Sequence, residues 1–239
     1  QKVLYADFEL SAKQFETRYS KNYLNHYQFS ENFLRLEINP DCDLPTGQNF
    51  EQLVFSHLEK TILETGTKIL IVDNLTYLKS GTETAKDALP LMKQLKELKR
   101  KFNLSILALA HTPKRDLSKP ITRNDLQGSK MLINFCDSSF TIGESTRDKN
   151  CRYLKQIKAR NTEIIYDTNN VVLCQVCKPD NFLMFEFTGY GTEKEHLKTI
   201  TDREERKEKA KELHEAGKSL RDIAIELGIS HQQVKRYLS

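Results

Sequence analysis

The stretch Lys68-Ile69-Leu70-Ile71-Val72-Asp73-Asn74-Leu75 is an apolar run that ends on a carboxylate and passes straight into a loop. A continuous Ile/Leu/Val run without polar alternation is typical of a strand that is buried on both faces of a parallel sheet. Ligands of open α/β sheets bind at the carboxyl ends of such strands, so we expect Asp73 to meet a ligand or its metal ion. A buried strand followed by an Asp-Asn turn would carry the same residues, and this stretch alone leaves both interpretations open.

Strands and helices alternate around this run as far as His111, and closely spaced strands follow. We expect strands over residues 2–6, 32–38, 68–72 and 104–110, helices from Ser11, over 49–66 and from about 89 to 102, and further strands over 135–142, 152–157, 171–176 and 182–187. This order predicts an α/β fold with a mainly parallel sheet that is flanked by helices and extended by antiparallel strands.

The first helix has a clear beginning and an apolar face. Ser11 with Gln14 three residues later is the pattern of a capping box. Phe15, Tyr19 and Tyr23 recur at four-residue spacing, which predicts that one face of this helix is apolar.

The composition is that of a soluble globular chain. Of its 239 residues, 38% are hydrophobic and 29% are charged, and no apolar run approaches the roughly 20 residues of a membrane span. No signal peptide is visible, although the chain begins at Gln1 without a Met, as a trimmed chain would. The net charge of +4 permits an anionic partner without requiring one.

The cysteines indicate a reducing environment. Their number is odd and they are scattered through expected strands and loops, which is typical of reduced thiols in a cytoplasmic protein. The pair Cys174-x-x-Cys177 has the spacing of two zinc ligands. No second Cys pair and no His follows at the sequence spacing of a zinc site, so we favour cysteines that simply belong to strands. The five residues are Cys42, Cys136, Cys151, Cys174 and Cys177.

The last 38 residues have the pattern of three short helices. Ser219 and Ser230 suit helix N-caps, and Gly228 suits a left-handed turn between the last two helices. A small core is expected from Leu220, Ile223, Ala224, Leu227, Ile229, Val234 and Leu238. We therefore divide the chain into a core over residues 1–187, a linker over 188–201 and a C-terminal module over 202–239.

This module resembles the helix-turn-helix of the Hin-type resolvases and sigma factors. The resemblance implies that the last helix recognises duplex DNA, because Gln pairs with adenine edges while Lys and Arg serve guanine or phosphate. Trihelical units of this kind also mediate protein contacts, which stays an alternative. The expected DNA-binding residues here are Ser230, His231, Gln232, Gln233, Lys235 and Arg236, and we expect the DNA-facing side of the same helix to present Tyr237 as well.

Residues 1–187 resemble the RecA-like P-loop ATPase superfamily, most closely the plasmid RepA-type and DnaB-type hexameric helicases. The motifs are Tyr5-Ala6-Asp7-Phe8-Glu9-Leu10-Ser11, the Asp73 strand, and the strand from Ser105 to His111. The resemblance implies that Glu9 orients and deprotonates the water that attacks ATP, that Asp73 holds Mg²⁺ through water, and that His111 senses the γ-phosphate. The alternatives are that Glu9 is an exposed acid in the first turn of a helix, where the helix dipole favours it, and that His111 has only a structural role.

The loop after His111 is basic and contains two prolines, Pro113 and Pro120, which prevent a helix. It is similar to the mobile loops that line the channel of ring helicases and grip the phosphates of single-stranded DNA. A solvated surface loop is the alternative. The basic residues are Lys114, Arg115, Lys119 and Arg123.

The run Lys155-Gln156-Ile157-Lys158-Ala159-Arg160-Asn161 carries the Lys-x-Arg-Asn pattern of these helicases. There the two cations project from one subunit into the neighbour's ATP site as a trans-acting finger. Alternation along a strand puts Lys158 and Arg160 on one face, so both can reach one phosphate group. The resemblance thus implies a homo-oligomer, a hexamer in the helicases; a basic strand edge that resists aggregation is the alternative.

The phosphate-binding loop G-x-x-x-x-G-K-[ST] is absent from the sequence. The only Gly-Lys-Ser is at residues 217–219, but Glu212 stands where the first glycine belongs and a helix precedes it. In the superfamily this loop lies just upstream of the Glu9 strand, so we expect that the chain begins after the loop and binds ATP poorly as it stands. A relative that has lost its ATPase activity is the other explanation.

Together these features predict the C-terminal part of a DNA-dependent ATPase. With ATP and Mg²⁺, the intact parent would be a replicative or mobilisation helicase that moves along DNA in a plasmid-like element. One rival is a non-enzymatic DNA-binding regulator that oligomerises through its α/β domain. A filament-forming recombination or repair ATPase of the same superfamily is a third possibility.

Overall fold

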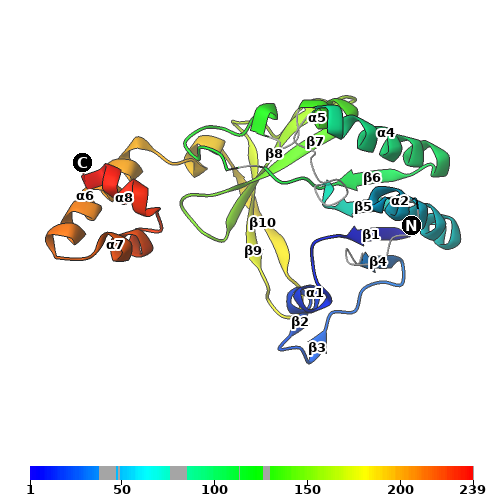
Figure 1. The fold of residues 1–239 in the computed structure, drawn as a ribbon, viewed down its shortest axis with the longest axis horizontal. Coiled ribbons are helices and arrows are strands. Elements are labelled where there is room, and N and C mark those ends of the chain that lie inside the picture. Colours follow the sequence, from blue (N-terminus) through cyan, green and yellow to red (C-terminus); the bar gives the residue numbers. More distant parts are fainter. Residues whose placement is uncertain (38–46, 48, 76–84, 113, 126–129, 239) are drawn as a thin grey trace.

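The computed structural model describes residues 1–37, 47, 49–75, 85–112, 114–125 and 130–238 (Figure 1). It contains a parallel sheet, an antiparallel sheet and a group of C-terminal helices, which confirms the predicted α/β fold class. Within these residues, no helix has the length and apolar character needed to cross a membrane.

The parallel sheet has four strands in the order β4-β1-β5-β6. Its two inner strands are β1 (Val3–Asp7) and β5 (Ile69–Asp73), and its outer strands are β4 (Phe33–Glu37) and β6 (Ser105–Ala108). Leu70 and Val72 of β5 are completely buried, as expected for the apolar run that contains them. Because Asp7 and Asp73 are partners in the register of β1 and β5, the two strands end side by side.

Two long helices cover this sheet, α2 (Phe50–Thr65) and α4 (Ala85–Phe102). Asn49 caps the start of α2, and Gly66 ends it in the left-handed conformation (φ 66°) that favours glycine. Leu58 and Ile62 of α2 belong to the same buried core as Leu95 of α4 and the inner strands. The predicted bounds of α2 are confirmed.

The short helix α1 (Ala12–Arg18) follows β1 and begins with the predicted Ser11–Gln14 capping box. It ends earlier than its aromatic spacing indicates, because the chain turns into the small hairpin of β2 (Ser20–Lys21) and β3 (Asn25–His26). The prediction for Tyr23 is therefore wrong, and its side chain lies exposed in the hairpin turn.

The antiparallel strands pair in the order β10-β9-β8-β7 and form a four-stranded sheet of their own. Residues 135–137 are not part of it, contrary to expectation, because helix α5 (Lys130–Phe135) runs to Phe135 and Lys158 binds the carbonyl oxygens at its end. The strands are β7 (Ser138–Glu144), β8 (Cys151–Ala159), β9 (Val171–Cys177) and β10 (Met184–Gly191).

The turn between β9 and β10 reaches the region of α1 (Figure 1). Phe182 packs between Tyr19 and Tyr27, with ring centroids 5.1 and 4.4 Å away, and Lys178 donates to the carbonyl oxygens of Thr17 and Ser20. These contacts join the antiparallel sheet to the segment that follows the end of β1.

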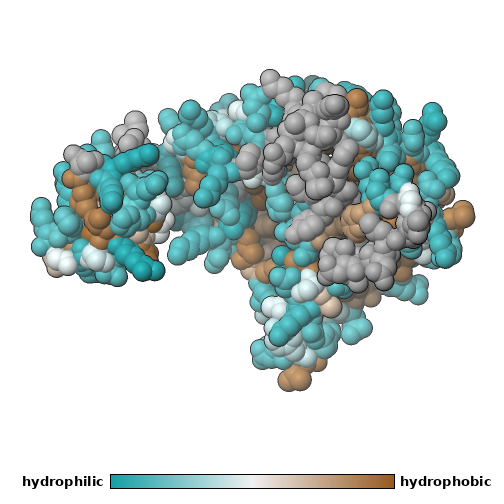
Figure 2. All heavy atoms as spheres, viewed as in Figure 1, coloured by the Kyte–Doolittle hydropathy of each residue, from teal (hydrophilic) through white to brown (hydrophobic). Residues whose placement is uncertain are grey.

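The C-terminal module consists of α6 (Ile200–Glu215), α7 (Leu220–Leu227) and α8 (His231–Leu238), which matches the predicted pattern. Ser219 caps α7 and Gly228 ends it with φ 61°. Figure 2 shows mainly hydrophilic residues over these helices, with apolar residues between them. The fully buried centre is Ala210, Ile223, Val234 and Tyr237. Tyr237 is thus a core residue and was wrongly expected on the DNA-facing side.

The segment before this module is more ordered than the predicted linker. Strand β10 continues to Gly191, and the short 3-10 helix η2 (Glu193–His196) packs on the antiparallel sheet. Residues 188–198 are held there because the buried Glu193 pairs with Lys155 and the Lys198 N–H donates to Leu117. The division of the chain into a core and a C-terminal module otherwise stays a prediction.

Candidate functional site

A polar cluster lies where β1, β5 and β6 end. Asp7 and Asp73 are the last residues of β1 and β5, and the loops after these strands and after β6 bring Glu9, Asn74 and His111 together. The sequence predicted Glu9, Asp73 and His111 for this edge, and the structure brings them there. This is also the edge at which open α/β sheets bind ligands.

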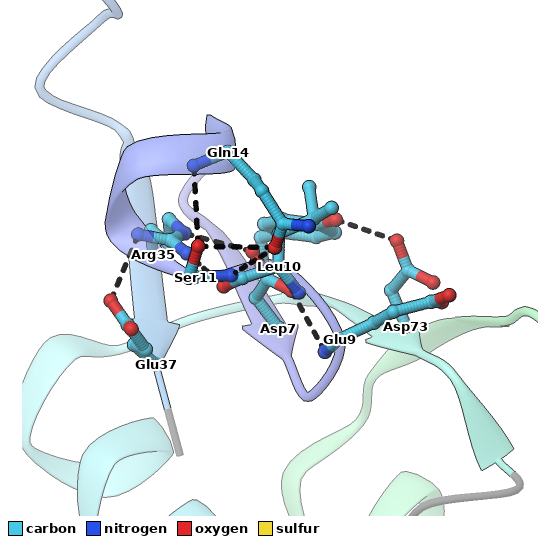
Figure 3. A network of polar contacts seen from close by, with 9 residues as sticks. Asp7, Glu9, Leu10, Ser11, Gln14, Arg35, Glu37 and Asp73 are labelled. Carbon is cyan, nitrogen blue, oxygen red and sulfur yellow. Dashed lines mark hydrogen bonds and ion pairs between the residues drawn. The ribbon is translucent and has the colours of Figure 1, made fainter. Parts of the chain in front are cut away.

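Asp73 is half-buried and accepts a hydrogen bond of 2.6 Å from the Tyr5 hydroxyl. Burial raises the pKa of the Asp73 carboxyl, the Tyr5 hydrogen bond opposes that rise, and the negative charges of Glu9 and Asp7 add to it. Burial and the same hydrogen bond raise the pKa of Tyr5, so Tyr5 stays a donor. Figure 3 shows the carboxylates of Glu9 and Asp73 on the same side of this edge.

Asp7 shapes the turn that presents Glu9. Its carboxylate is buried, accepts from the backbone N–H of Glu9 (3.2 Å) and Leu10 (2.9 Å), and pairs with Arg35 Nε (2.9 Å; Figure 3). Arg35 also donates to the Leu10 carbonyl oxygen (2.8 Å). Since its charge and both carboxylate oxygens are engaged, Asp7 fixes the loop, and Glu9 remains the accessible acid.

Asn74 joins Glu9 to His111. Its Nδ2 lies 2.8 Å from Glu9 Oε2 and 2.9 Å from His111 Nε2, and Glu9 Oε2 is 3.3 Å from His111 Nε2. Asn74 is 1% exposed, whereas the side chains of Glu9 and His111 are 37% and 58% exposed. Asn74 was not predicted as a site residue, because it was considered only as part of an alternative Asp-Asn turn. Its position beside the expected ligand-facing Asp73 was the available signal.

The arrangement suits water activation next to a metal–phosphate group. Glu9 is an exposed carboxylate that a water molecule can reach, which a general base requires. In the described part of the chain, no group of three or more acidic, His or Cys side chains could hold a metal ion alone. Mg²⁺ binds through one or two carboxylates together with waters and substrate phosphates. Asp73, with hard oxygen donors, fits that role.

Lys158 and Arg160 converge on the end of α5, as expected for residues on one face. Lys158 Nζ donates to the carbonyl oxygens of Ile133 (2.6 Å) and Asn134 (3.2 Å), and Arg160 donates to Asn134 (3.2 Å). Arg160 also pairs with Asp137 at 3.0 Å. Cations are stabilised at the carboxyl end of a helix, so within one chain the pair has a structural role as well.

The basic loop is anchored in its second half. Ile121 is buried, its N–H donates to Glu193 Oε1 (2.7 Å), and its carbonyl oxygen accepts from Lys155 Nζ (2.8 Å). Arg115 donates to the Lys119 carbonyl oxygen. A buried ion pair thus holds Ile121 in place, and the mobility of the loop stays a prediction. Of the four DNA-binding residues predicted in this loop, Lys114, Lys119 and Arg123 are exposed and Arg115 is half-buried.

Helix α8, which was expected to recognise DNA, presents a polar face. Ser230 caps its start by accepting from the Gln233 N–H (3.2 Å), while Val234 and Tyr237 face the core. Gln233 is half-buried and its Nε2 lies 3.3 Å from the Tyr237 hydroxyl, so it is less available to DNA than predicted. The exposed residues are Ser230, His231, Gln232, Lys235 and Arg236.

Comparison with protein-family models gives two matches. Residues 1–116 match the AAA domain, and residues 199–239 match the helix-turn-helix domain of resolvase. No curated protein matches the chain. The first match spans the parallel sheet and the polar cluster at its edge, and the second spans α6 to α8. The chain therefore combines an AAA-type, ATPase-like domain with a helix-turn-helix that supports DNA binding.

Proposed function

We propose that this chain is part of a DNA-dependent ATPase of the RecA-like superfamily, of the RepA or DnaB helicase type, that couples ATP hydrolysis to movement along DNA in the cytoplasm. The single observation that carries the proposal is the meeting of Glu9, Asn74 and His111 beside Asp73 at the carboxyl ends of adjacent parallel strands. A carboxylate that water can reach, next to a second carboxylate suited to Mg²⁺, is what phosphoryl transfer to water requires.

Each residue has a role in this proposal. Glu9 orients the attacking water and accepts its proton, and Asp73 holds Mg²⁺ through a coordinated water. His111, exposed in the loop after the neighbouring strand β6, contacts the nucleotide's terminal phosphate and leads into the basic loop. Mg²⁺, when bound, neutralises charge on the phosphate oxygens.

The proposal includes an oligomer, a hexamer in the helicases it resembles. Lys158 and Arg160 both bind the carbonyl oxygen of Asn134, so their charges gather at one point, and Arg160 is 52% exposed on its side chain. Such a pair suits a finger that stabilises charge on a phosphate of the adjacent subunit. Single-stranded DNA would pass along the exposed basic residues of the loop after β6, and duplex DNA would bind α8.

A DNA-binding regulator without ATPase activity is the second candidate, because the helix-turn-helix match alone would account for DNA binding. In that case the α/β domain would serve assembly only. Upstream sequence separates the two candidates, since a phosphate-binding loop before Gln1 favours the enzyme.

A mixing experiment tests the enzyme and its trans-acting finger together. In the longest natural form of the chain, Glu9→Gln and Arg160→Ala are each expected to abolish ATP turnover. When the two inactive proteins are mixed, some interfaces combine an intact Glu9 from one subunit with an intact Arg160 from its neighbour, so turnover returns. Full activity of Arg160→Ala alone, or no recovery after mixing, would contradict the trans role. Absence of turnover in the unmutated protein would contradict the enzyme.

A further inference from the structure

The amide of Asn74 has a defined orientation. An ionised carboxylate only accepts hydrogen bonds, so the group of Asn74 that lies 2.8 Å from Glu9 Oε2 must be the NH₂ group. The same nitrogen lies 2.9 Å from His111 Nε2. One NH₂ group has two hydrogens, which is enough to donate to both partners at once.

This orientation determines the tautomer of His111. Because Asn74 Nδ2 donates to it, Nε2 of the neutral ring must be the unprotonated nitrogen, and Nδ1 must carry the hydrogen. The exposed ring then presents an N–H donor at Nδ1, which suits an anionic phosphate oxygen. In the other tautomer, the Nε2–H group would point at the NH₂ donor of Asn74. Its only acceptor in this cluster would then be Glu9 Oε2, which is 3.3 Å from Nε2.

We propose that Asn74 is a positioning residue that couples His111 to Glu9, holding one oxygen of the Glu9 carboxylate and setting the tautomer through which His111 meets phosphate. The inference rests on the proposed function and extends it to a third residue of the site. Asn74 is 1% exposed and lies directly after Asp73, so the strand end itself fixes its position. With Oε2 held by Asn74, Oε1 of Glu9 remains available to water.

The tautomer can be measured without any catalysis. We would record ¹⁵N spectra of the histidine rings in the full chain, in buffer above the ordinary pKa range of histidine. The His111 signal, assigned by its loss in His111→Leu, is expected to show the Nδ1–H form. In Asn74→Leu, which has the same shape but no donor, His111 is expected to revert to the Nε2–H form. An Nε2–H ring in the unmutated chain, or no change in Asn74→Leu, would overturn the coupling.

Kinetics then distinguish positioning from stability. In the longest natural form of the chain, Asn74→Leu is expected to lower kcat for ATP on the order of 100-fold with little change in KM, because a misplaced base affects the chemical step. A loss confined to KM would overturn the inference. If Asn74→Leu does not fold, Asn74→Asp provides the same comparison, since its carboxylate would accept from His111 Nε2 and repel Glu9. Absence of hydrolysis in the unmutated protein, with the Nδ1–H form present, would overturn the proposed function and leave the Asn74 contact standing.

Discussion

Two glutamates of this chain have opposite surroundings. Glu193 is completely buried and accepts from Lys155 Nζ (2.5 Å) and the Ile121 N–H (2.7 Å), with the Tyr153 hydroxyl at 3.4 Å. Glu9 is 37% exposed on its side chain and shares one oxygen with Asn74 and His111. A carboxylate whose acceptor positions are filled from the protein fixes a fold. One with an oxygen open to water can do chemistry.

The two sites also differ in what they connect. Around Glu193, the basic loop, strand β8 and the turn before α6 meet in one buried junction. Around Glu9, three strand ends meet at an open edge. If this comparison is right, mutations at the junction should change stability, and mutations at the edge should change activity.

The largest effect is expected from Lys155→Met. Removing one partner of a buried ion pair leaves Glu193 charged without compensation, which lowers the free energy of unfolding by about 3–5 kcal/mol. Denaturant unfolding followed by circular dichroism measures it. The double variant Lys155→Met with Glu193→Leu is expected to lose less free energy of unfolding than Lys155→Met alone. A loss equal to the sum of the two single-variant losses would contradict a buried ion pair at this junction.

Glu193→Gln is expected to lower the free energy of unfolding less than Lys155→Met does, but more than Glu9→Gln does, in the same assay. Glu193→Gln lowers the free energy of unfolding by about 1–3 kcal/mol, because the buried Lys155 loses its charged partner. Glu9→Gln changes it by no more than about 0.5 kcal/mol, as exposed substitutions do. Equal losses in the two variants would mean that Glu9 is structural.

The same contrast recurs on α8, where Lys235 is exposed and Tyr237 is buried. Lys235→Ala is expected to weaken duplex DNA binding and to reduce the slope of log affinity against log salt by about 1, because one phosphate contact is lost. Lys211→Ala on α6 is the matched control, since this residue is also exposed. Identical salt slopes in both variants would exclude α8 as the binding helix.

The smallest effect concerns His196 in the buried junction, whose Nδ1 lies 2.9 Å from the Ser145 hydroxyl. Burial, and then the charge of Arg147, lower the pKa of His196. His196 therefore binds a proton more readily in the unfolded chain than in the folded one. Its contribution to the free energy of unfolding is complete above about pH 6.5 and is lost as the pH falls below that value. In His196→Asn, which keeps a polar group near Ser145, that part of the decline should disappear. An unchanged decline in unfolding scans across this range would contradict the assignment.

Some of these features were predictable because one short pattern determines them. The apolar run before Asp73 predicted β5, while the caps at Ser11 and Ser219 and the turn glycine Gly228 predicted where helices begin and end. Glu9 and His111 could be expected near Asp73 because parallel strands end at a common edge. Asn74 was missed because a buried bridging amide has the same sequence context as a turn.

The remaining misses depend on contacts between distant residues. Glu193 lies in a polar segment and gives no sign of burial until Lys155 and Ile121 are placed beside it. For that reason the predicted linker includes the end of β10 and the helix η2. Tyr237 follows Val234 by three residues, a helical spacing that places both on the core side, but Tyr237 was expected on the DNA-facing side with the polar residues of this helix.

The most direct test of the account is ATP hydrolysis by the longest natural form of the chain, with and without single-stranded DNA, in the unmutated protein, Glu9→Gln and Glu31→Gln. Glu31 is an exposed glutamate just before β4 and serves as the matched control. We expect DNA-stimulated turnover that Glu31→Gln keeps and Glu9→Gln loses. Turnover that survives in Glu9→Gln, or none in the unmutated protein despite tight and salt-sensitive binding to duplex DNA, would contradict it.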